Sequence, residues 1–343
     1  MKILMIALDY HAYTQAIENE FRNAGHEVVR HSIVPDAFAI KALKLHEPTY
    51  LRAVARYHSD ILARERGNGY DWVFFLQCHY FSRSNLEAYR SAFAGARFTL
   101  YNWDSIRTHD YLPYRDLFDD IYTFDPHDAE AENLRYLPLF CIRDFQGIRR
   151  SAKSDPAVYV IGNVAAPGRY LMVEAFRKYC REAGIPIQVF LKAGLLGHIK
   201  LRRAIPAMRG VSWRSIKHDR FLQMMASSTA TFDFANHSQV GMTMRVVENL
   251  CAGLKIITSN HHVLDKPFYS PDRIHLYHGA DFSGVRDFLE TPLADPDADF
   301  PEYHIQTFAR HLIEGTQHVR AARPREAVLR SGDGGNPAVI EAV

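Results

Sequence analysis

Short apolar runs alternate with longer amphipathic stretches through the first half of the chain. The apolar runs predict buried strands at 3–8, 27–31, 72–76, 98–101, 120–124 and 136–139. A long helical region is expected over 36–66, where Leu51, Val54 and Ile61 recur near helical spacing. Strands and helices that alternate in this way are typical of a parallel sheet with helices on its faces.

The pattern breaks over 143–156, a stretch of Arg, Lys, Ser, Asp and Gly that we interpret as a linker, and then resumes. The second half predicts strands at 157–161, 187–191, 229–234, 255–258 and 274–276, and helices over 168–183, 219–226 and 242–252. We therefore expect an α/β protein of two Rossmann-like domains, 1–145 and 146–300, whose parallel sheets face each other across a cleft. Residues 301–343 are expected to add a C-terminal helix, over 303–319, and a poorly ordered tail.

The composition agrees with two globular domains, because roughly 150 residues is an ordinary domain size. Hydrophobic residues make up 47% and charged residues 23% of the 343 residues, which is ordinary for a globular protein. The formal net charge is only +2, so no overall field attracts nucleic acid. We expect no nucleic-acid partner, and an anionic ligand must be recognised locally.

The cysteines and the first apolar run both indicate a reducing compartment. Four cysteines lie far apart with no CxxC pair, and we interpret them as reduced core thiols: Cys78, Cys141, Cys180 and Cys251. The run at 3–8 stops at Asp9 without a small-residue cleavage site, which favours a strand over a secretory leader. No apolar stretch approaches the roughly 20 residues that cross a bilayer. We expect a soluble, cytoplasmic protein.

The most informative segment runs from 231 to 260 and has the pattern of strand, polar loop, helix, glycine and strand. The free N–H groups and positive dipole end of that helix can bind a pyrophosphate. Arg245 lies about one turn into the helix, where a guanidinium can reach the same phosphates. Glu248 shares that face, and its carboxylate can accept hydrogen bonds from two ribose hydroxyls. Gly253 is expected to end the helix.

The sequence of residues 245–260, RVVENLCAGLKIITSN, resembles the donor-site signature of GT-B glycosyltransferases. It is most similar to bacterial polysaccharide and lipopolysaccharide enzymes and to the CgeB-like group. The resemblance implies that Glu248 binds the donor ribose and that the loop before the helix binds the diphosphate, through Ser238, Gln239, Gly241, Met242 and Thr243. It also implies a donor domain at 146–300, an acceptor-side domain at 1–145, and a transferase of the hexosyltransferase type. Because the helix terminus and Arg245, with Arg169, can neutralise the pyrophosphate, we expect the transfer to be metal-independent. The nucleotide-sugar is then a substrate, and no cofactor is expected.

Further donor contacts are expected after other strands of the second domain. Gly162, Asn163 and Arg169 follow the strand at 157–161, where glycosyltransferases of this type often bring a glycine and a basic residue to the phosphates. Lys192 follows the strand at 187–191, and Asn260 follows the strand at 255–258. The alternative at these positions is a surface turn or a solvated lysine.

Inversion of the sugar's configuration is favoured over retention. Retaining members of the family often carry a second glutamate eight positions before the ribose glutamate, and here Val240 occupies that position. Inversion needs a base on the first domain that takes the acceptor proton. Four residues after strands are candidates, in order of preference Asp104, His11, His79 and Asp9. For each of them a cap or turn residue is the alternative. The aromatic residues Tyr10, Tyr101 and Trp103 are either core residues or a platform for the sugar.

Two other patterns carry less weight. Asp297 and Asp299 imitate a metal-binding DxD, but they lie in a proline-interrupted linker, so no metal site is expected. The basic run over 198–203, which continues to Arg209, is a solvated helix face or a peripheral contact with lipid head groups. The acceptor is expected to be a glycan, a lipid-linked molecule or a small molecule.

Two other functions share these features. A nucleotide-sugar epimerase on the same fold would also use Glu248 for the ribose, but it needs acid and base residues at the sugar instead of an open acceptor cleft. A non-catalytic sugar-binding protein is the other alternative. An NAD-dependent oxidoreductase is disfavoured, because no GxGxxG follows the first strand.

Overall fold

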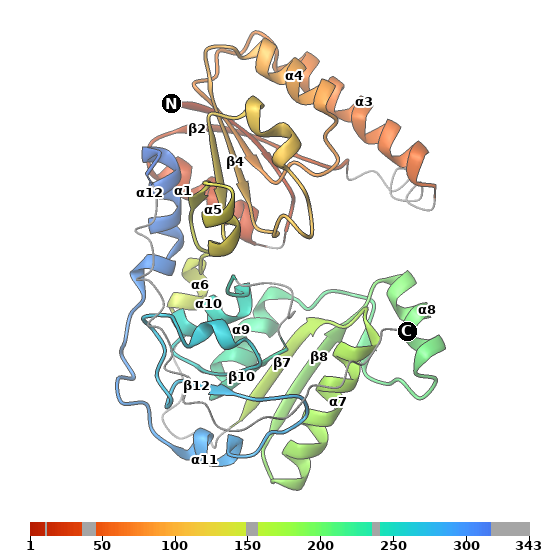
Figure 1. The fold of residues 1–343 in the computed structure, drawn as a ribbon, viewed down its shortest axis with the longest axis vertical. Coiled ribbons are helices and arrows are strands. Elements are labelled where there is room, and N and C mark those ends of the chain that lie inside the picture. Colours follow the sequence, from red (N-terminus) through yellow and green to blue (C-terminus); the bar gives the residue numbers. More distant parts are fainter. Residues whose placement is uncertain (11, 36–45, 149–156, 235–240, 317–343) are drawn as a thin grey trace, which may run out of the picture.

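The computed structural model describes residues 1–316 except 11, 36–45, 149–156 and 235–240. Two parallel sheets of six strands each form the two halves of the molecule (Figure 1). The halves meet where α6 (Arg143–Gln146) packs on α10 (Met244–Cys251). The structure therefore confirms the predicted α/β class with two parallel sheets.

The first sheet has the order β2-β1-β3-β4-β5-β6. Its strands are β1 Lys2–Ala7, β2 Glu27–Ser32, β3 Trp72–Leu76, β4 Arg97–Asn102, β5 Asp120–Thr123 and β6 Arg135–Tyr136. Its helices are α1 Tyr13–Asn23, α3 Glu47–Glu65, α4 Arg83–Ala92, the 3₁₀ helix η2 Leu112–Leu117, and α5 Pro126–Ala131. Every residue of β3 is buried, as expected for an apolar strand in a sheet covered on both faces.

The second sheet has the order β12-β11-β10-β7-β8-β9. Its strands are β7 Val158–Asn163, β8 Ile187–Lys192, β9 Val211–Ser212, β10 Ala230–Asp233, β11 Lys255–Thr258 and β12 Ile274–Leu276. Its helices, besides α10, are α7 Pro167–Glu182, α8 Leu195–Ala204, α9 His218–Ala226, the 3₁₀ helix η3 His261–Val263, and α11 Val285–Glu290. The strand order reverses between β7 and β10, and open α/β sheets bind ligands beside such a switch point.

The last described helix returns to the first half of the molecule. After the 3₁₀ helix η4 (Pro301–Tyr303), α12 (Ile305–Glu314) packs along α1 (Figure 1). The Phe308 ring lies 4.8 Å from the Tyr101 ring and 4.2 Å from the Phe140 ring, measured between centroids. Aromatic packing of this kind adds α12 to the core beneath the first sheet.

Element boundaries depart from the sequence predictions in a few places. The strand expected at 136–139 is only β6, which ends at Tyr136, because Pro138 has no N–H to donate to a ladder. Strand β9 was not predicted, since two residues carry no periodicity. Within the helical region expected over 36–66, α3 begins at Glu47, and 36–45 lie outside the described residues.

The cysteines are reduced thiols, as the sequence predicts. All four cysteines are free, and three of them are buried. Among the residues described, none of the helices has both the length and the apolar character needed to cross a membrane.

Candidate functional site

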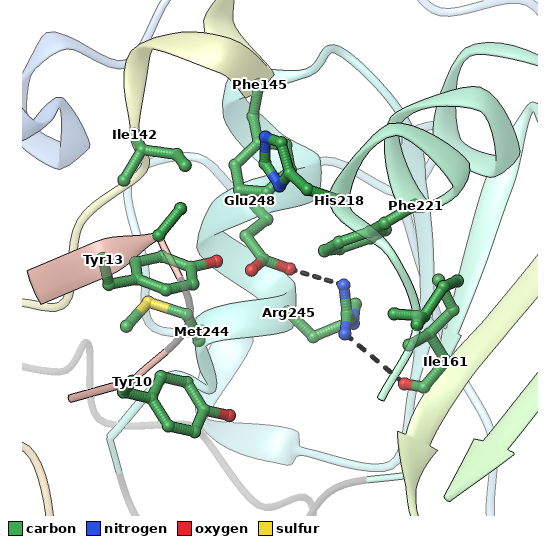
Figure 2. A pocket seen from close by; sticks show the side chains of 12 residues that line it. Tyr10, Tyr13, Ile142, Phe145, Ile161, His218, Phe221, Met244, Arg245 and Glu248 are labelled. Atoms are coloured by element: carbon green, nitrogen blue, oxygen red, sulfur yellow. Dashed lines mark hydrogen bonds and ion pairs between the residues drawn. The ribbon is translucent and has the colours of Figure 1, made fainter. Parts of the chain in front are cut away.

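The candidate site is a pocket between the two halves, at the carboxyl ends of both sheets. Its volume is about 280 Å³. The first half supplies residues after β1 and around α6. The second half supplies residues from β7, from α9 and the segment just before it, and from α10. The lining residues are Tyr10, Ala12, Tyr13, Ile142, Phe145, Ile161, Ile216, His218, Phe221, Met244, Arg245 and Glu248 (Figure 2). The pocket therefore lies beside the switch point of the second sheet, where open α/β sheets usually bind ligands.

Helix α10 carries three of the lining residues, Met244, Arg245 and Glu248. It begins after Thr243, whose hydroxyl accepts a hydrogen bond from the Val246 amide at 3.3 Å. Such an N-cap satisfies one of the free donors of the first turn. Gly253 follows the helix with a φ of 66°, a left-handed conformation that favours glycine. Gly253 thus ends the helix as the sequence predicted.

Glu248 and Arg245 form an ion pair on the face of α10 that lines the pocket. The Arg245 guanidinium donates to Glu248 Oε2 at 2.5 Å and to the Ile161 carbonyl at 3.4 Å (Figure 2). The same guanidinium lies 4.7 Å from the centroid of the Phe221 ring. Charge pairing and cation–π contact together hold Arg245 in one orientation inside the pocket.

Burial changes the protonation behaviour of Glu248. Its side chain is almost inaccessible, and burial raises the pKa of the carboxyl well above its usual range, with a further increase from the neighbouring Cys251. The Arg245 guanidinium acts in the opposite direction, because a nearby cation favours the charged carboxylate. The charge of Glu248 therefore depends on the pairing with Arg245.

Two tyrosines of the first half face this pair. The hydroxyl of Tyr13 is buried, has no hydrogen-bond partner among the described residues, and is turned toward Glu248 (Figure 2). The ring of Tyr10 packs edge-on against Trp103 at 5.6 Å between centroids. A buried hydroxyl without a partner is costly unless a ligand supplies one. The pocket therefore offers a hydrogen-bonding group from each half of the molecule.

A buried aspartate, Asp233 at the end of β10, holds the start of α10 in place. Its carboxylate accepts hydrogen bonds from Thr243 at 3.2 Å and from Thr258 at 2.9 Å. Burial raises the pKa of the Asp233 carboxyl, whereas the Thr258 hydroxyl and the Arg245 charge lower it. These bonds join β10, the start of α10 and the end of β11. Asp233 therefore fixes the position at which α10 enters the cleft.

The loop before α10 is only partly described, since Ser238, Gln239 and Val240 lie outside the described residues. Gly241 contacts the first half: its amide donates to the Asp125 carboxylate at 3.3 Å. A Cβ on Gly241 would lie 2.5 Å from the Phe124 ring, so only glycine fits there without displacement. Met242 beside it is buried. In this structure the Gly241 amide thus joins the two halves instead of pointing freely into the cleft.

The predicted loop after β7 is arranged around Phe234. A Cβ on Gly162 would overlap the Phe234 ring, which accounts for the glycine. Arg169 stacks over the same ring at 5.7 Å and donates to the Asn163 carbonyl at 3.4 Å. The Asn163 side chain accepts from the Ala165 amide at 3.1 Å, which makes it a turn residue here.

Lys192 and Asn260 do not line the pocket. The Lys192 ammonium donates to the Ser215 hydroxyl at 2.7 Å at the end of β8. The Asn260 side chain caps η3 by accepting from the His262 amide at 3.0 Å. Both residues occupy the carboxyl edge of the sheet, as predicted, but their side chains are engaged in local bonds.

The leading base candidate, Asp104, is held by one neighbour. Gln77 donates to Asp104 Oδ2 at 2.7 Å. Gln77 is fully buried and has a φ of 68°, a strained conformation for a residue with a side chain. Strain of this kind persists where surrounding contacts enforce it, often at functional sites. Asp104 lies after β4, outside the lining of the pocket itself.

The other base candidates have different surroundings. Burial lowers the pKa of His79 to about 4, and His109 nearby adds to that effect, so His79 is a neutral imidazole at ordinary pH. Asp9 is exposed and forms an ion pair with Arg30 of β2. His11 lies outside the described residues.

Several lining residues were not predicted from the sequence. His218 of α9 lines the pocket and bonds Asp144 of α6 at 2.7 Å, so the two form a second polar link between the halves. Phe221 and Phe145 pack with ring centroids 5.2 Å apart across the same boundary. No sequence signal identifies these pairs, because each joins residues more than 70 positions apart. Among the described residues, no group of three His, Cys, Asp or Glu side chains is arranged to hold a metal ion.

The fold is shared with solved structures of sugar-transferring and sugar-modifying enzymes. An alpha-glucosyltransferase in complex with UDP and a 13-mer DNA aligns with a TM-score of 0.57 at 11% identity, over 92% of this chain and 96% of that chain. AviGT4, a glycosyltransferase involved in Avilamycin A biosynthesis, aligns with a TM-score of 0.54 at 12% identity, over 92% and 96%. UDP-GlcNAc 2-epimerase from Methanocaldococcus jannaschii aligns with a TM-score of 0.51 at 6% identity, over 92% and 99%. No family model and no curated protein sequence matches the chain. The two-domain architecture is thus the GT-B fold.

Proposed function

We propose that this chain is a glycosyltransferase that moves a sugar from a nucleotide-sugar donor to a hydroxyl acceptor. The observation that carries the proposal is the ion pair between buried Glu248 and half-buried Arg245 on α10, which lines the pocket between the two sheets. A carboxylate and a guanidinium side by side match a ribose diol and a diphosphate, which are the constant parts of a nucleotide-sugar. The donor-site resemblance of residues 245–260 assigns the ribose to the same glutamate.

Three neighbouring features support a donor in this pocket. Tyr13 turns a buried hydroxyl toward Glu248, where a ligand can supply its missing partner. Ile161, Ile216 and Phe221 offer apolar walls suited to a flat base. Arg169 lies in the first turn of α7, just after the carboxyl end of β7, where its positive charge can act on the phosphates of a donor. Neither a metal nor a cofactor is part of the proposal.

We place the acceptor on the side of the first half and propose inversion, with Asp104 as the base. The support is the Gln77 hydrogen bond, which holds one carboxylate oxygen and fixes the orientation of Asp104. Trp103 and Tyr10, in edge-on contact next to it, provide an aromatic surface for a sugar. The acceptor is a glycan, a lipid-linked molecule or a small molecule.

A ligand panel tests the donor class. Wild-type protein is melted with the diphosphates of uridine, guanosine, thymidine and adenosine, and with the free sugars. A nucleotide present at about 100 times its dissociation constant stabilises the folded state by about 2.7 kcal/mol. Stabilisation by one nucleoside diphosphate supports the proposal, whereas stabilisation by a free sugar alone indicates a sugar-binding protein. UDP is the first ligand to test, because the alpha-glucosyltransferase neighbour was solved with it.

The epimerase alternative is supported by the neighbour of that activity. Incubating the stabilising nucleotide-sugar without an acceptor separates the two functions. An epimerase changes the sugar's configuration under these conditions, whereas a transferase leaves the nucleotide-sugar intact or hydrolyses it slowly. NMR of the sugar anomeric signals distinguishes these products, and also reports inversion once an acceptor is known.

A further inference from the structure

The outer edge of the second half carries an unusual combination of exposed apolar and basic side chains. Four of the nine exposed large hydrophobic residues of the described chain lie in one short stretch: Leu195, Leu196, Ile199 and Trp213. These residues are 65%, 61%, 43% and 68% exposed, respectively. Residues 195–217 also contain six Lys or Arg and no Asp or Glu, in a chain whose net charge is +2. We call the exposed side chains among residues 195–217 the α8 surface; Ile216, which lines the pocket, is not part of it.

The helix α8 separates these residues onto one outward face. At 100° per residue, Leu195, Ile199 and Arg202 fall on one stripe, and Leu196 and Arg203 fall on the stripe beside it. All five are exposed. The opposite face is packed: Leu201 is fully buried, and a Cβ on Gly197 would lie 3.0 Å from Ala165. The helix therefore holds its leucines outward because its other side is anchored to the domain.

Trp213 belongs to the same surface because the sheet brings it there. The Ala193 amide, two residues before α8, donates to the Ser212 carbonyl at 2.9 Å, and Trp213 follows directly. Strands β8 and β9 are parallel, so α8 and Trp213 both leave the sheet at its carboxyl edge. That edge also contains Ile161, which lines the pocket. Figure 1 shows α8 at the outer end of the second half, beyond β8.

We propose that the α8 surface binds the face of an anionic phospholipid bilayer. Leucine, isoleucine and tryptophan side chains on one helix face enter the boundary between head groups and acyl chains, and the arginines beside them pair with lipid phosphates. Each basic side chain near an anionic membrane contributes about 1 kcal/mol. The exposed aliphatic side chains disfavour nucleic acid as the partner, and the six like charges disfavour a second copy of this chain on the same surface.

On the proposed function, this placement also selects among acceptors. Helix α8 follows β8, the strand beside β7, and Ile161 of β7 lines the pocket, so a bilayer bound at α8 lies at the sheet edge that carries the pocket. An acceptor carried by a membrane lipid then reaches the pocket without leaving the bilayer. Membrane binding itself does not depend on the transfer reaction, and its test needs no sugar donor.

Flotation of the full chain with vesicles tests the proposal. We expect binding to vesicles of phosphatidylglycerol and phosphatidylcholine, and much weaker binding to phosphatidylcholine alone. The double variant Leu195→Asn with Leu196→Asn should lower affinity for the anionic vesicles about 100-fold, because two aliphatic side chains no longer enter the lipid. Leu264→Asn is the matched control, since Leu264 is 46% exposed after β11 and should change nothing.

A charge variant and a fluorescence signal give independent readouts. Arg202→Gln with Arg203→Gln should lower affinity for anionic vesicles about 30-fold and leave phosphatidylcholine binding unchanged. Vesicles should shift the emission of Trp213 to shorter wavelength, an effect absent in Trp213→Ser. Melting curves check that each variant folds. If the leucine variant does not fold, the arginine variant still tests the proposal. The proposal would be overturned if the wild type did not bind anionic vesicles, or if both double variants bound them as tightly as the wild type. It would also be overturned if the wild type bound DNA or RNA instead of vesicles, or formed a dimer that the leucine variant dissociates.

Discussion

Arg245 donates a hydrogen bond of 2.5 Å to Glu248 inside the pocket, and the two residues lie about one turn apart on α10. The pair is preorganised by the Ile161 carbonyl and the Phe221 ring, which both contact the guanidinium. A ligand therefore meets a fixed carboxylate and a fixed cation, and does not have to order two long side chains. Preorganisation of this kind lowers the entropic cost of binding.

Replacing Glu248 by Gln should weaken donor binding. The substitution keeps the shape but removes the charge that accepts from the ribose hydroxyls, so affinity for the nucleoside diphosphate should fall by about 1.5 to 3 kcal/mol. Calorimetry measures the change. Glu174→Gln is a matched control, because Glu174 forms a half-exposed pair with Arg177 at the same i,i+3 spacing on α7, away from the pocket. Equal affinity in wild type and Glu248→Gln would remove the basis of the donor assignment.

Replacing Asp104 by Asn should affect turnover and spare donor affinity. If the carboxylate takes the acceptor proton, the rate should fall by about 100-fold to 10,000-fold. Asp110→Asn, an exposed residue of the same loop, controls for loss of a charge. A transfer assay with normal turnover in Asp104→Asn would exclude this base and direct attention to His79, Asp9 and His11.

Transfer activity should persist in EDTA. The proposed donor phosphates are neutralised by Arg245 and by the start of α10, a role that a divalent cation fills in other enzymes. Initial rates are compared with and without chelator, and again after Mg²⁺ or Mn²⁺ is restored. Activity that disappears with EDTA and returns with either ion would contradict the metal-independent mechanism.

Replacing Gly241 by Ala should lower stability. The added Cβ would lie 2.5 Å from the Phe124 ring, so the contact between the halves must open or the ring must move. The expected loss is about 1 to 3 kcal/mol in the free energy of unfolding, the usual cost of overpacking. Gly168→Ala is the matched control, because nothing lies within 4 Å of a Cβ there. Urea unfolding of both variants tests the expectation, and equal losses would show that the Phe124 contact is not limiting.

Protonation of His58 should destabilise the protein in mild acid. Burial lowers the pKa of His58 to about 4, against roughly 6.5 in the unfolded chain. The unfolded state thus binds more protons, so this contribution to stability is complete above about pH 6.5 and is lost as pH falls toward 4. At about pH 5 the loss is roughly 2 kcal/mol. His58→Phe retains a ring against Phe81 and should reduce the pH dependence by that amount in urea titrations, whereas His46→Gln, at an exposed site, should not.

The amino-acid sequence by itself determined the elements whose signal is local. The apolar runs located β3, β11 and β12 at their observed bounds, since buried parallel strands are continuous hydrophobic segments. The cap and the glycine around α10 are likewise local features. Because they define the two ends of the helix, the three-residue spacing of Arg245 and Glu248 is enough to put both side chains on one helix face.

Only the tertiary structure decided how these elements meet. The His218–Asp144 bond, the Gly241–Asp125 bond and the return of α12 to the first sheet each join residues far apart in the chain. Such contacts depend on the relative orientation of two separately formed sheets, which no periodicity encodes. For the same reason the sequence identified the polar residues of the pocket on α10 but not Tyr13 or Phe221, which ordinary core patterns conceal.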